Sequence, residues 1–169
     1  MSTEPLATAI YEGNTPLVHE ILTTGFREDG FSHYDFAEQT RMYDTMMTIA
    51  VKYGNMEIIK ELINKGYSLN DGDDFKKTPL ICAVELRKYD VLELLLASGA
   101  SINTPAYWND TPLYNAAAIG DEKSVNILLQ AGADTSILAR DFSGGTKTAY
   151  DIAISNNHIN VAQLIKQHR

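Results

Sequence analysis

A segment of 33 residues recurs along this chain, and this period limits the folds that the chain can adopt. The motif Thr78–Leu80 returns as Thr111–Leu113, and the same separation lies between Gly66, Gly99 and Gly132. A unit this short cannot bury an apolar core by itself, so each unit has to stack against its neighbours. The period therefore predicts an elongated stack of similar units, without one central core.

Extending the frame outward predicts five units within one domain that covers residues 1–169. The units are about 4–25, 45–66, 78–99, 111–132 and 148–169, and the longer connections between them are insertions at 26–44 and 133–147. The first unit begins almost directly with a helix. The last unit ends with Lys166–Arg169, whose cations are favourable at a helix C-terminus. We therefore expect a complete small protein.

Each unit is expected to form two short helices joined by a turn. Threonine followed by proline predicts a helix start, since the hydroxyl accepts a hydrogen bond from a free N–H and proline has none to lose. A left-handed residue is expected to end the first helix four positions after the recurring alanine. These positions are Gly13, Gly54, Gly120 and Asn157, with Arg87 as the exception. Asp71–Gly72 is expected to form a hairpin turn.

These motifs resemble the ankyrin repeat, whose pattern is Thr-Pro-Leu-His-x-Ala in the first helix and Leu-Leu-x-x-Gly-Ala in the second. Ser98–Asn103 and Ala131–Asp134 match the ending of the second helix. The resemblance covers nearly the whole chain and implies an all-α ankyrin-repeat solenoid, in which stacked helix-turn-helix units have β-hairpin-like connecting loops. The histidine of the pattern is replaced in every unit, by Ala7, Thr48, Ile81, Tyr114 and Asp151. This departure predicts a less rigid stack.

The charge balance excludes several classes of function. The chain has 14 basic and 22 acidic residues, which give a net charge of −8 and a pI near 4.9. This balance opposes binding to phosphate backbones, so nucleic acid is not expected as a partner. The longest apolar segment, Val91–Leu96, is too short to span a membrane, and no signal peptide is visible. We therefore expect a cytoplasmic protein that does not bind membranes.

The residues that could carry catalysis are few. The four histidines show no metal-ligand spacing with one another or with cysteine; they are His19, His33, His158 and His168. Cys82 is expected to be a small buried packing residue. The sequence therefore predicts no catalytic residue, no metal and no cofactor. The alternative is an enzyme or a toxin-related activity in which His33, Asp35 and Glu38 of the first insertion act as acid or base groups.

The first insertion is rich in aromatic residues. Five of the 15 aromatics of the chain lie between residues 26 and 43, at Phe26, Phe31, Tyr34, Phe36 and Tyr43. A long loop needs packing of its own to be ordered, which favours rings that fold back over the helices of the first two units. The other interpretation is a protruding contact loop.

The resemblance implies that a partner binds the concave face formed by the hairpin tips and the first helices. Counting from the threonine and the alanine of each unit predicts an exposed apolar patch with a polar rim. The predicted patch is Phe75, Trp108, Tyr107, Tyr53, Leu86 and Ile119, and its rim is Asp74, Asp110 and Glu85. The alternative is that the aromatic tips merely pack on neighbouring hairpins.

Together these features predict a non-enzymatic, monomeric protein-protein interaction module that inhibits or regulates a protein partner. Asp71, Asp73, Asp74 and Asp110 lie around the predicted face, which favours a partner with a basic surface. One version is an acidic immunity protein that neutralises a basic toxin. The alternative to a regulator is a structural, self-associating scaffold.

Overall fold

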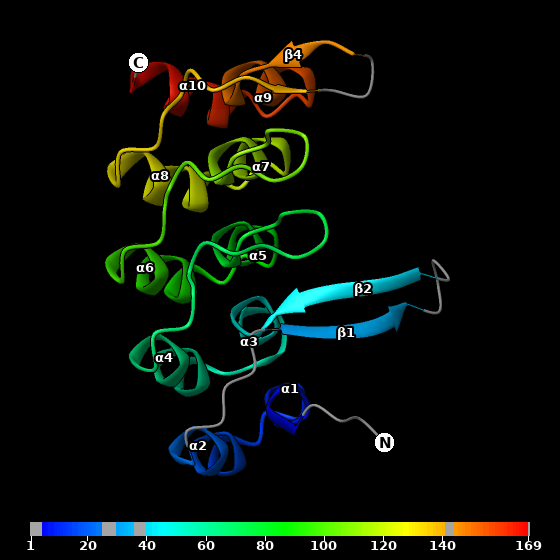
Figure 1. The fold of residues 1–169 in the computed structure, drawn as a ribbon. Helices are drawn as coiled ribbons and strands as arrows, with labels where there is room; N and C mark the ends of the chain where they lie inside the picture. Colours follow the sequence, from blue (N-terminus) through cyan, green and yellow to red (C-terminus); the bar gives the residue numbers. More distant parts are fainter. Residues whose placement is uncertain (1–4, 25–29, 36–39, 141–143, 169) are drawn as a thin grey trace.

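The computed structural model describes residues 5–24, 30–35, 40–140 and 144–168, and within them five antiparallel helix pairs stack into an elongated body (Figure 1). The first helices of the pairs, called here the inner helices, are α1 (Pro5–Tyr11), α3 (Met46–Tyr53), α5 (Pro79–Glu85), α7 (Pro112–Ala118) and α9 (Ala149–Ser155). The outer helices are α2 (Thr15–Thr23), α4 (Met56–Asn64), α6 (Tyr89–Ala97), α8 (Glu122–Gln130) and α10 (Ile159–Gln167). This architecture confirms the predicted all-α solenoid.

The inner helices begin as the threonine motif predicts. Four of them start after a threonine whose side-chain oxygen accepts a hydrogen bond from the backbone N–H three residues later. These threonines are Thr45, Thr78, Thr111 and Thr148. Proline occupies the first turn of α5 and α7, where its missing N–H leaves no hydrogen bond unmade. The start of each inner helix is therefore set by local hydrogen bonding.

The turns that end the inner helices differ from the prediction at two positions. Gly13, Gly120 and Asn157 are left-handed as expected, but Arg87 also adopts a φ of 54° and is not an exception. Gly54 is extended, with a φ of −73°. It is needed for a different reason, since a Cβ there would lie 2.7 Å from the backbone oxygen of Ala50.

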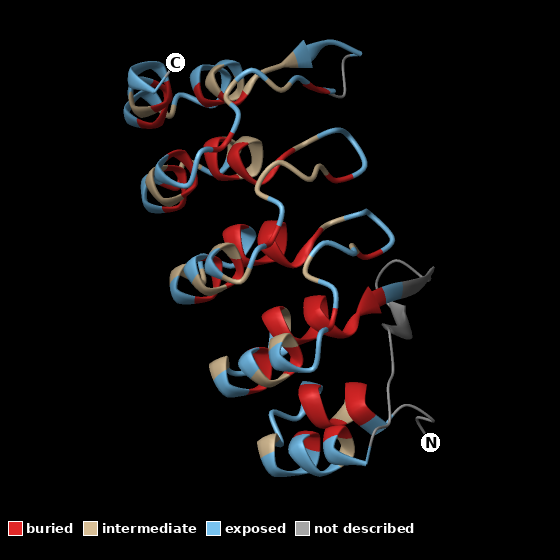
Figure 2. Ribbon diagram, turned by 60° about the vertical axis from the view of Figure 1, so that its left-hand side comes forward, coloured by how far each residue is buried: buried red, intermediate tan, exposed pale blue. Residues whose placement is uncertain are grey.

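The apolar core runs between the helix pairs along the whole stack. The recurring alanine of every unit is fully buried at the contact between inner helices, at Ala9, Ala50, Ala83, Ala116 and Ala153. Figure 2 shows that buried residues concentrate on the inner helices, whereas the outer sides of the outer helices are exposed. Cys82 is buried as predicted, and burial raises the pKa of its thiol to about 12.

Two β-hairpins connect helix pairs within the described residues. Strands β1 (Gly30–Asp35) and β2 (Thr40–Thr45) are antiparallel, with Gly30 opposite Thr45 and Asp35 opposite Thr40. Strands β3 (Ala139–Arg140) and β4 (Thr146–Lys147) form the second hairpin.

The β1–β2 hairpin extends away from α3, farther than the other connections (Figure 1). Its backbone course is that of a protruding hairpin, and where its aromatic rings pack lies outside the described side chains. Phe26, Phe36 and Glu38 lie outside the described residues, and so do the side chains of Phe31, His33, Tyr34 and Asp35.

Among the described residues, no helix has the length and apolar character needed to cross a lipid bilayer.

Candidate protein-binding face

The connection before α5, residues 71–77, forms a tight hairpin that we call the first tip. The N–H of Lys76 donates to the backbone oxygen of Asp73 at 2.7 Å, and Lys76 is left-handed with a φ of 58°. The turn therefore spans 73–76 with Asp74 and Phe75 at its centre, and the turn predicted at Asp71–Gly72 is wrong by three positions. The Asp73 carboxylate fixes the position of this turn, because one of its oxygens accepts hydrogen bonds from the N–H of Phe75 and the N–H of Lys77, each at 3.0 Å.

The connection before α7, residues 104–110, forms a second tip with the same backbone course. Ala106 and Asp110 are joined by an N–H to oxygen bond of 3.0 Å, and Asn109 is left-handed with a φ of 64°. The carboxylate here comes from the other end of the turn, since Asp110 Oδ1 accepts from the N–H of Trp108 at 3.1 Å. The Asn109 amide also donates to the backbone oxygen of Leu138 at 2.6 Å.

Backbone hydrogen bonds link each tip to the next. The N–H of Asp74 donates to the oxygen of Tyr43 at 3.2 Å, and the N–H of Tyr107 donates to the oxygen of Phe75 at 3.0 Å. The N–H of Arg140, on the β3–β4 hairpin, donates to the oxygen of Trp108 at 2.8 Å. The tips therefore form one connected surface, and the backbone supplies the contact between them.

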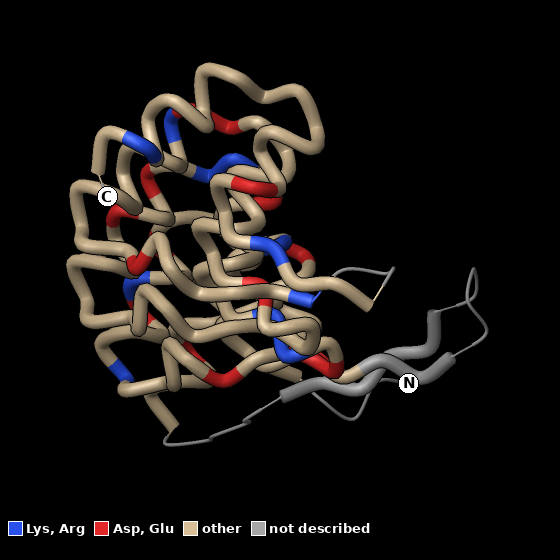
Figure 3. Tube along the Cα trace, turned by 90° about the horizontal axis from the view of Figure 1, so that it is seen from above, with Lys and Arg blue, Asp and Glu red and all other residues tan. Residues whose placement is uncertain are grey.

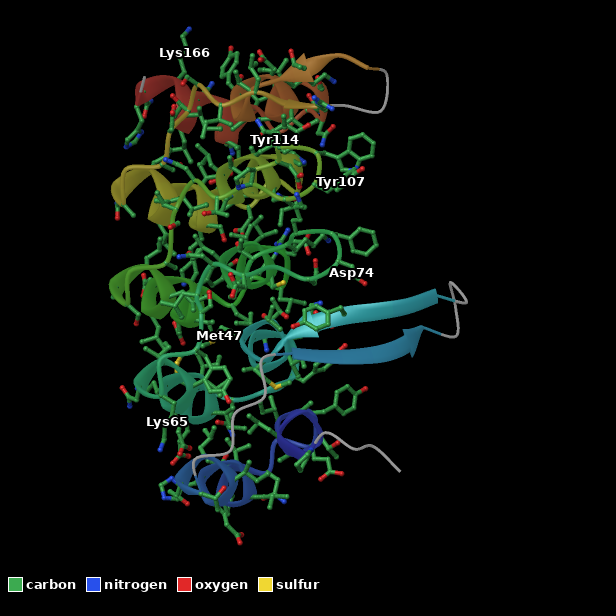
Figure 4. The ribbon with its side chains drawn as sticks, in the orientation of Figure 1. Met47, Lys65, Asp74, Tyr107, Tyr114 and Lys166 are labelled. Atoms are coloured by element: carbon green, nitrogen blue, oxygen red, sulfur yellow. The ribbon has the colours of Figure 1, made fainter. Side chains whose placement is uncertain are left out.

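All six apolar residues of the predicted patch are exposed. Tyr107 is 65% exposed and Ile119, at the other extreme, is 36% exposed; between them lie Tyr53, Phe75, Leu86 and Trp108. The rings of Tyr107 and Trp108 meet edge to face with their centres 5.4 Å apart. Figure 4 shows Tyr107 at the outer end of its tip, with Asp74 on the preceding tip. Phe75 and Trp108 are about half covered by the protein, so part of each ring packs on the stack and the rest faces solvent.

The patch continues onto the inner helices as an apolar stripe. Tyr53, Leu86 and Ile119 occupy equivalent positions at the ends of α3, α5 and α7, spaced by 33 residues. Tyr11 on α1 was not predicted as part of the patch, yet it is 63% exposed and its ring centre lies 4.6 Å from that of Tyr53. Its place at the end of an inner helix was the available signal.

The acidic residues of the predicted rim are engaged in the fold to different degrees. Asp74 accepts from the N–H of Tyr43 at 2.8 Å and remains exposed. Glu85 forms an ion pair with Lys77 at 2.8 Å, with both side chains about one third exposed. Asp110 is half-buried and also accepts from the amide of Asn115 at 3.1 Å. The rim is therefore held in place by local bonds.

Asp73 is not part of the exposed face, which corrects its assignment as a surface charge. Its carboxylate is nearly buried and lies 3.3 Å from Lys52 Nζ, which also contacts Asp44 at 2.6 Å. Burial by itself lowers the pKa of Lys52, but the hydrogen bond to Asp44 and the charges of both carboxylates raise that pKa above its ordinary value. This ion-pair group ties the first tip to α3.

A recess opens among three consecutive tips, and we call it the tip recess. It has a volume of about 450 Å³. Its lining residues are Lys76, Pro105, Ala106, Tyr107, Asn109, Leu138, Arg140 and Thr146. Sequence reasoning did not find Leu138 and Arg140, because the insertion at 133–147 interrupts the 33-residue frame there. Figure 3 shows charges of both signs interspersed on the tip side of the stack.

The histidines whose side chains are described contact neighbouring protein groups. His19 Nδ1 lies 2.8 Å from Glu61 Oε1, and His168 Nδ1 lies 3.0 Å from the backbone oxygen of Leu164. His158 Nε2 lies 3.2 Å from the backbone oxygen of Ala118, at the end of α7. In the described part of the chain, no group of three His, Cys, Asp or Glu residues could hold a metal ion.

Models of one known protein family match most of the chain. A model described as ankyrin repeats, in three copies, matches residues 6–106, and a model of the ankyrin repeat matches residues 108–142. No protein with a curated description matches the chain. The matched segments include both tips, the inner-helix stripe and most of the lining of the tip recess.

Proposed function

The chain belongs to the ankyrin-repeat family, and from this premise we propose that it is a non-enzymatic module whose protein partner docks on the tips and the inner-helix stripe. Ankyrin repeats are generally protein-protein interaction modules. The observation that carries the proposal is the exposure of Phe75, Tyr107 and Trp108 on tips whose backbone is held by hydrogen bonds.

The energetics support these tips as the anchor of an interface. A half-exposed aromatic side chain still has on the order of 100 Å² to bury, which contributes roughly 2.5 kcal/mol. Because the tips are already fixed in conformation, little ordering entropy is lost when a partner binds. Aromatic residues in such positions are the usual hot spots of protein interfaces.

The finer form of the proposal is a monomeric, cytoplasmic inhibitor or regulator that acts by covering or positioning its partner. Light scattering of the purified chain measures its molar mass in solution and so tests whether it is a monomer. A dimer at micromolar concentration would favour the self-associating scaffold instead.

We also propose a partner with a basic surface. The net charge of −8 and the exposed carboxylates of Glu12, Asp74 and Glu85 support it. Asp73 and Asp110 contribute less than their sequence positions indicated, because the fold uses them internally. The association rate should fall as ionic strength rises. A rate that does not change with salt would contradict the basic partner.

The deciding experiment is affinity purification with mass spectrometry, comparing the wild-type chain with a Phe75→Ala/Trp108→Ala variant. The partner it identifies is then titrated against each single variant, and we expect each to lower the affinity about 30-fold. Ile159→Ala on α10 is the matched control, since Ile159 is also about half exposed but lies on an outer helix. Unchanged affinity in correctly folded Phe75 and Trp108 variants would refute the proposal.

A further inference from the structure

The acidic and basic side chains of the tips differ in the contacts that they make with the rest of the protein. Asp73, Asp74 and Asp110 each accept a hydrogen bond from a backbone N–H, so these carboxylates serve the fold of the tips. Lys76 and Arg140 are exposed, and within the described residues neither side chain forms an ion pair or a hydrogen bond. Lys77 of the first tip differs, because it is paired with Glu85. In a chain that is acidic overall, Lys76 and Arg140 are therefore available to another molecule.

The position of Lys76 is unusual for a lysine. It is left-handed, a conformation that favours glycine or asparagine, and the equivalent residue of the second tip is Asn109. Asn109 uses its amide to hold the neighbouring hairpin at Leu138, whereas Lys76 makes no such contact. A lysine held in this strained conformation without a contact that stabilises the fold is a candidate for a binding role.

Both cations line the tip recess, and apolar side chains line it as well. Tyr107 and Leu138 line the same recess and are 65% and 49% exposed. A guanidinium and an ammonium group recognise a carboxylate through charge-assisted hydrogen bonds, and the guanidinium does so with two parallel donors. The recess therefore combines a site for a carboxylate with a surface for an apolar side chain.

We propose that the tip recess takes an acidic side chain from an extended segment of the protein partner. Lys76 and Arg140 hold its carboxylate, and an apolar side chain next to it in the segment packs on Tyr107 and Leu138. This inference rests on the proposed function and specifies the chemistry of one contact within it. The net negative charge attracts a basic partner at long range, while the recess selects one acidic side chain at contact.

The test uses a displayed library of random 12-residue peptides, selected on the full-length chain. Enriched peptides should carry Asp or Glu next to an aromatic or aliphatic residue. The best peptide is then compared with its own Asp→Asn or Glu→Gln version, and the amide version should bind about tenfold more weakly. Enrichment of peptides without an acidic residue, or equal binding of the amide version, overturns the inference.

Variants of the chain identify the site. Lys76→Asn and Arg140→Gln should each weaken binding of the selected peptide about tenfold. Lys76→Asn also keeps the turn, because asparagine already occupies the equivalent position at residue 109. Lys60→Gln on α4 removes the same charge from an exposed outer-helix site and should leave binding unchanged.

The outcomes separate this inference from the proposed function. If Phe75→Ala or Trp108→Ala abolishes binding while Lys76→Asn and Arg140→Gln have no effect, the tips bind but the recess does not select an acid. If all four variants bind the peptide like the wild type, the proposed face itself is wrong.

Discussion

The first and second tips have the same backbone turn, yet different side chains hold it. In the first tip the carboxylate comes from Asp73, at the start of the turn, and it is tied to α3 through Lys52. In the second tip it comes from Asp110, at the end of the turn, and Asn115 on α7 supports it. The two tips therefore share the same turn, but different side-chain contacts attach each tip to its inner helix.

The largest expected effect is the loss of the carboxylate that ties down the first tip. Asp73→Ala removes two backbone hydrogen bonds and leaves Lys52 with one of its two carboxylate partners, so we expect a loss of about 3 kcal/mol in the free energy of unfolding. Asp110→Ala, the matched change in the second tip, should lower it by about 1 kcal/mol. Urea denaturation measures both, and equal losses would show that the tips are held alike.

The next largest effect is a pH dependence of the free energy of unfolding that arises beside the first tip and not beside the second. Cys82 on α5 and Asn115 on α7 are equivalent positions, so only the first tip has a titrating thiol near it. Burial raises the pKa of this thiol from 9.0 to about 12. Below pH 9 the thiol is protonated in both states. Above pH 9 the unfolded chain loses the proton first, which favours unfolding.

The free energy of unfolding should therefore fall by about 1.4 kcal/mol between pH 8 and pH 10 because of this thiol. Cys82→Ala removes this contribution. Between pH 8 and pH 10 the free energy of unfolding of the variant should therefore fall by about 1.4 kcal/mol less than that of the wild type. The raised pKa of Lys52 acts only above its unfolded value of 10.5 and leaves this window unaffected. Parallel pH profiles for the two proteins would contradict the predicted role of the thiol.

The smallest effect concerns the left-handed residue of each turn. Lys76→Asn should raise the free energy of unfolding by about 0.5 kcal/mol, since asparagine is better tolerated at positive φ. The reverse change, Asn109→Lys, should lower it by about 1 kcal/mol because the bond to Leu138 is also lost. Thermal unfolding followed by circular dichroism measures both, and a destabilised Lys76→Asn protein would show that lysine has a structural role in the turn.

Much of the fold could be predicted because its determinants are local. A threonine at the start of a helix accepts a hydrogen bond from a residue three positions away, so the start of α5 or α7 depends on a few neighbouring residues. The exposure of Phe75 and Trp108 followed from the same counting, since a tip lies at a constant distance from that threonine.

The misassigned turns show where local reasoning ends. Asp71–Gly72 has the residue types of a hairpin turn, but Gly72 is instead needed where the backbone of Lys76 approaches, since a Cβ would lie 2.5 Å from its carbonyl carbon. Gly54 and Arg87 make the same point, because the residue type favoured the opposite conformation at each. At Gly72 and Gly54 the backbone four positions away leaves no room for a Cβ, a steric requirement that the residue type alone does not reveal.

By itself, the sequence determined the repeat, the helix starts and the exposed apolar tips, because each depends on hydrogen bonds and periodicity within one unit. The tertiary structure alone decided which charges remain available. Asp73 is withdrawn from the surface by Lys52, 21 residues away in another unit, and Lys76 shares a recess with Arg140 from a third hairpin. Such pairings arise from the stacking of units, and a period within each unit carries no information about which side chains of different units will meet.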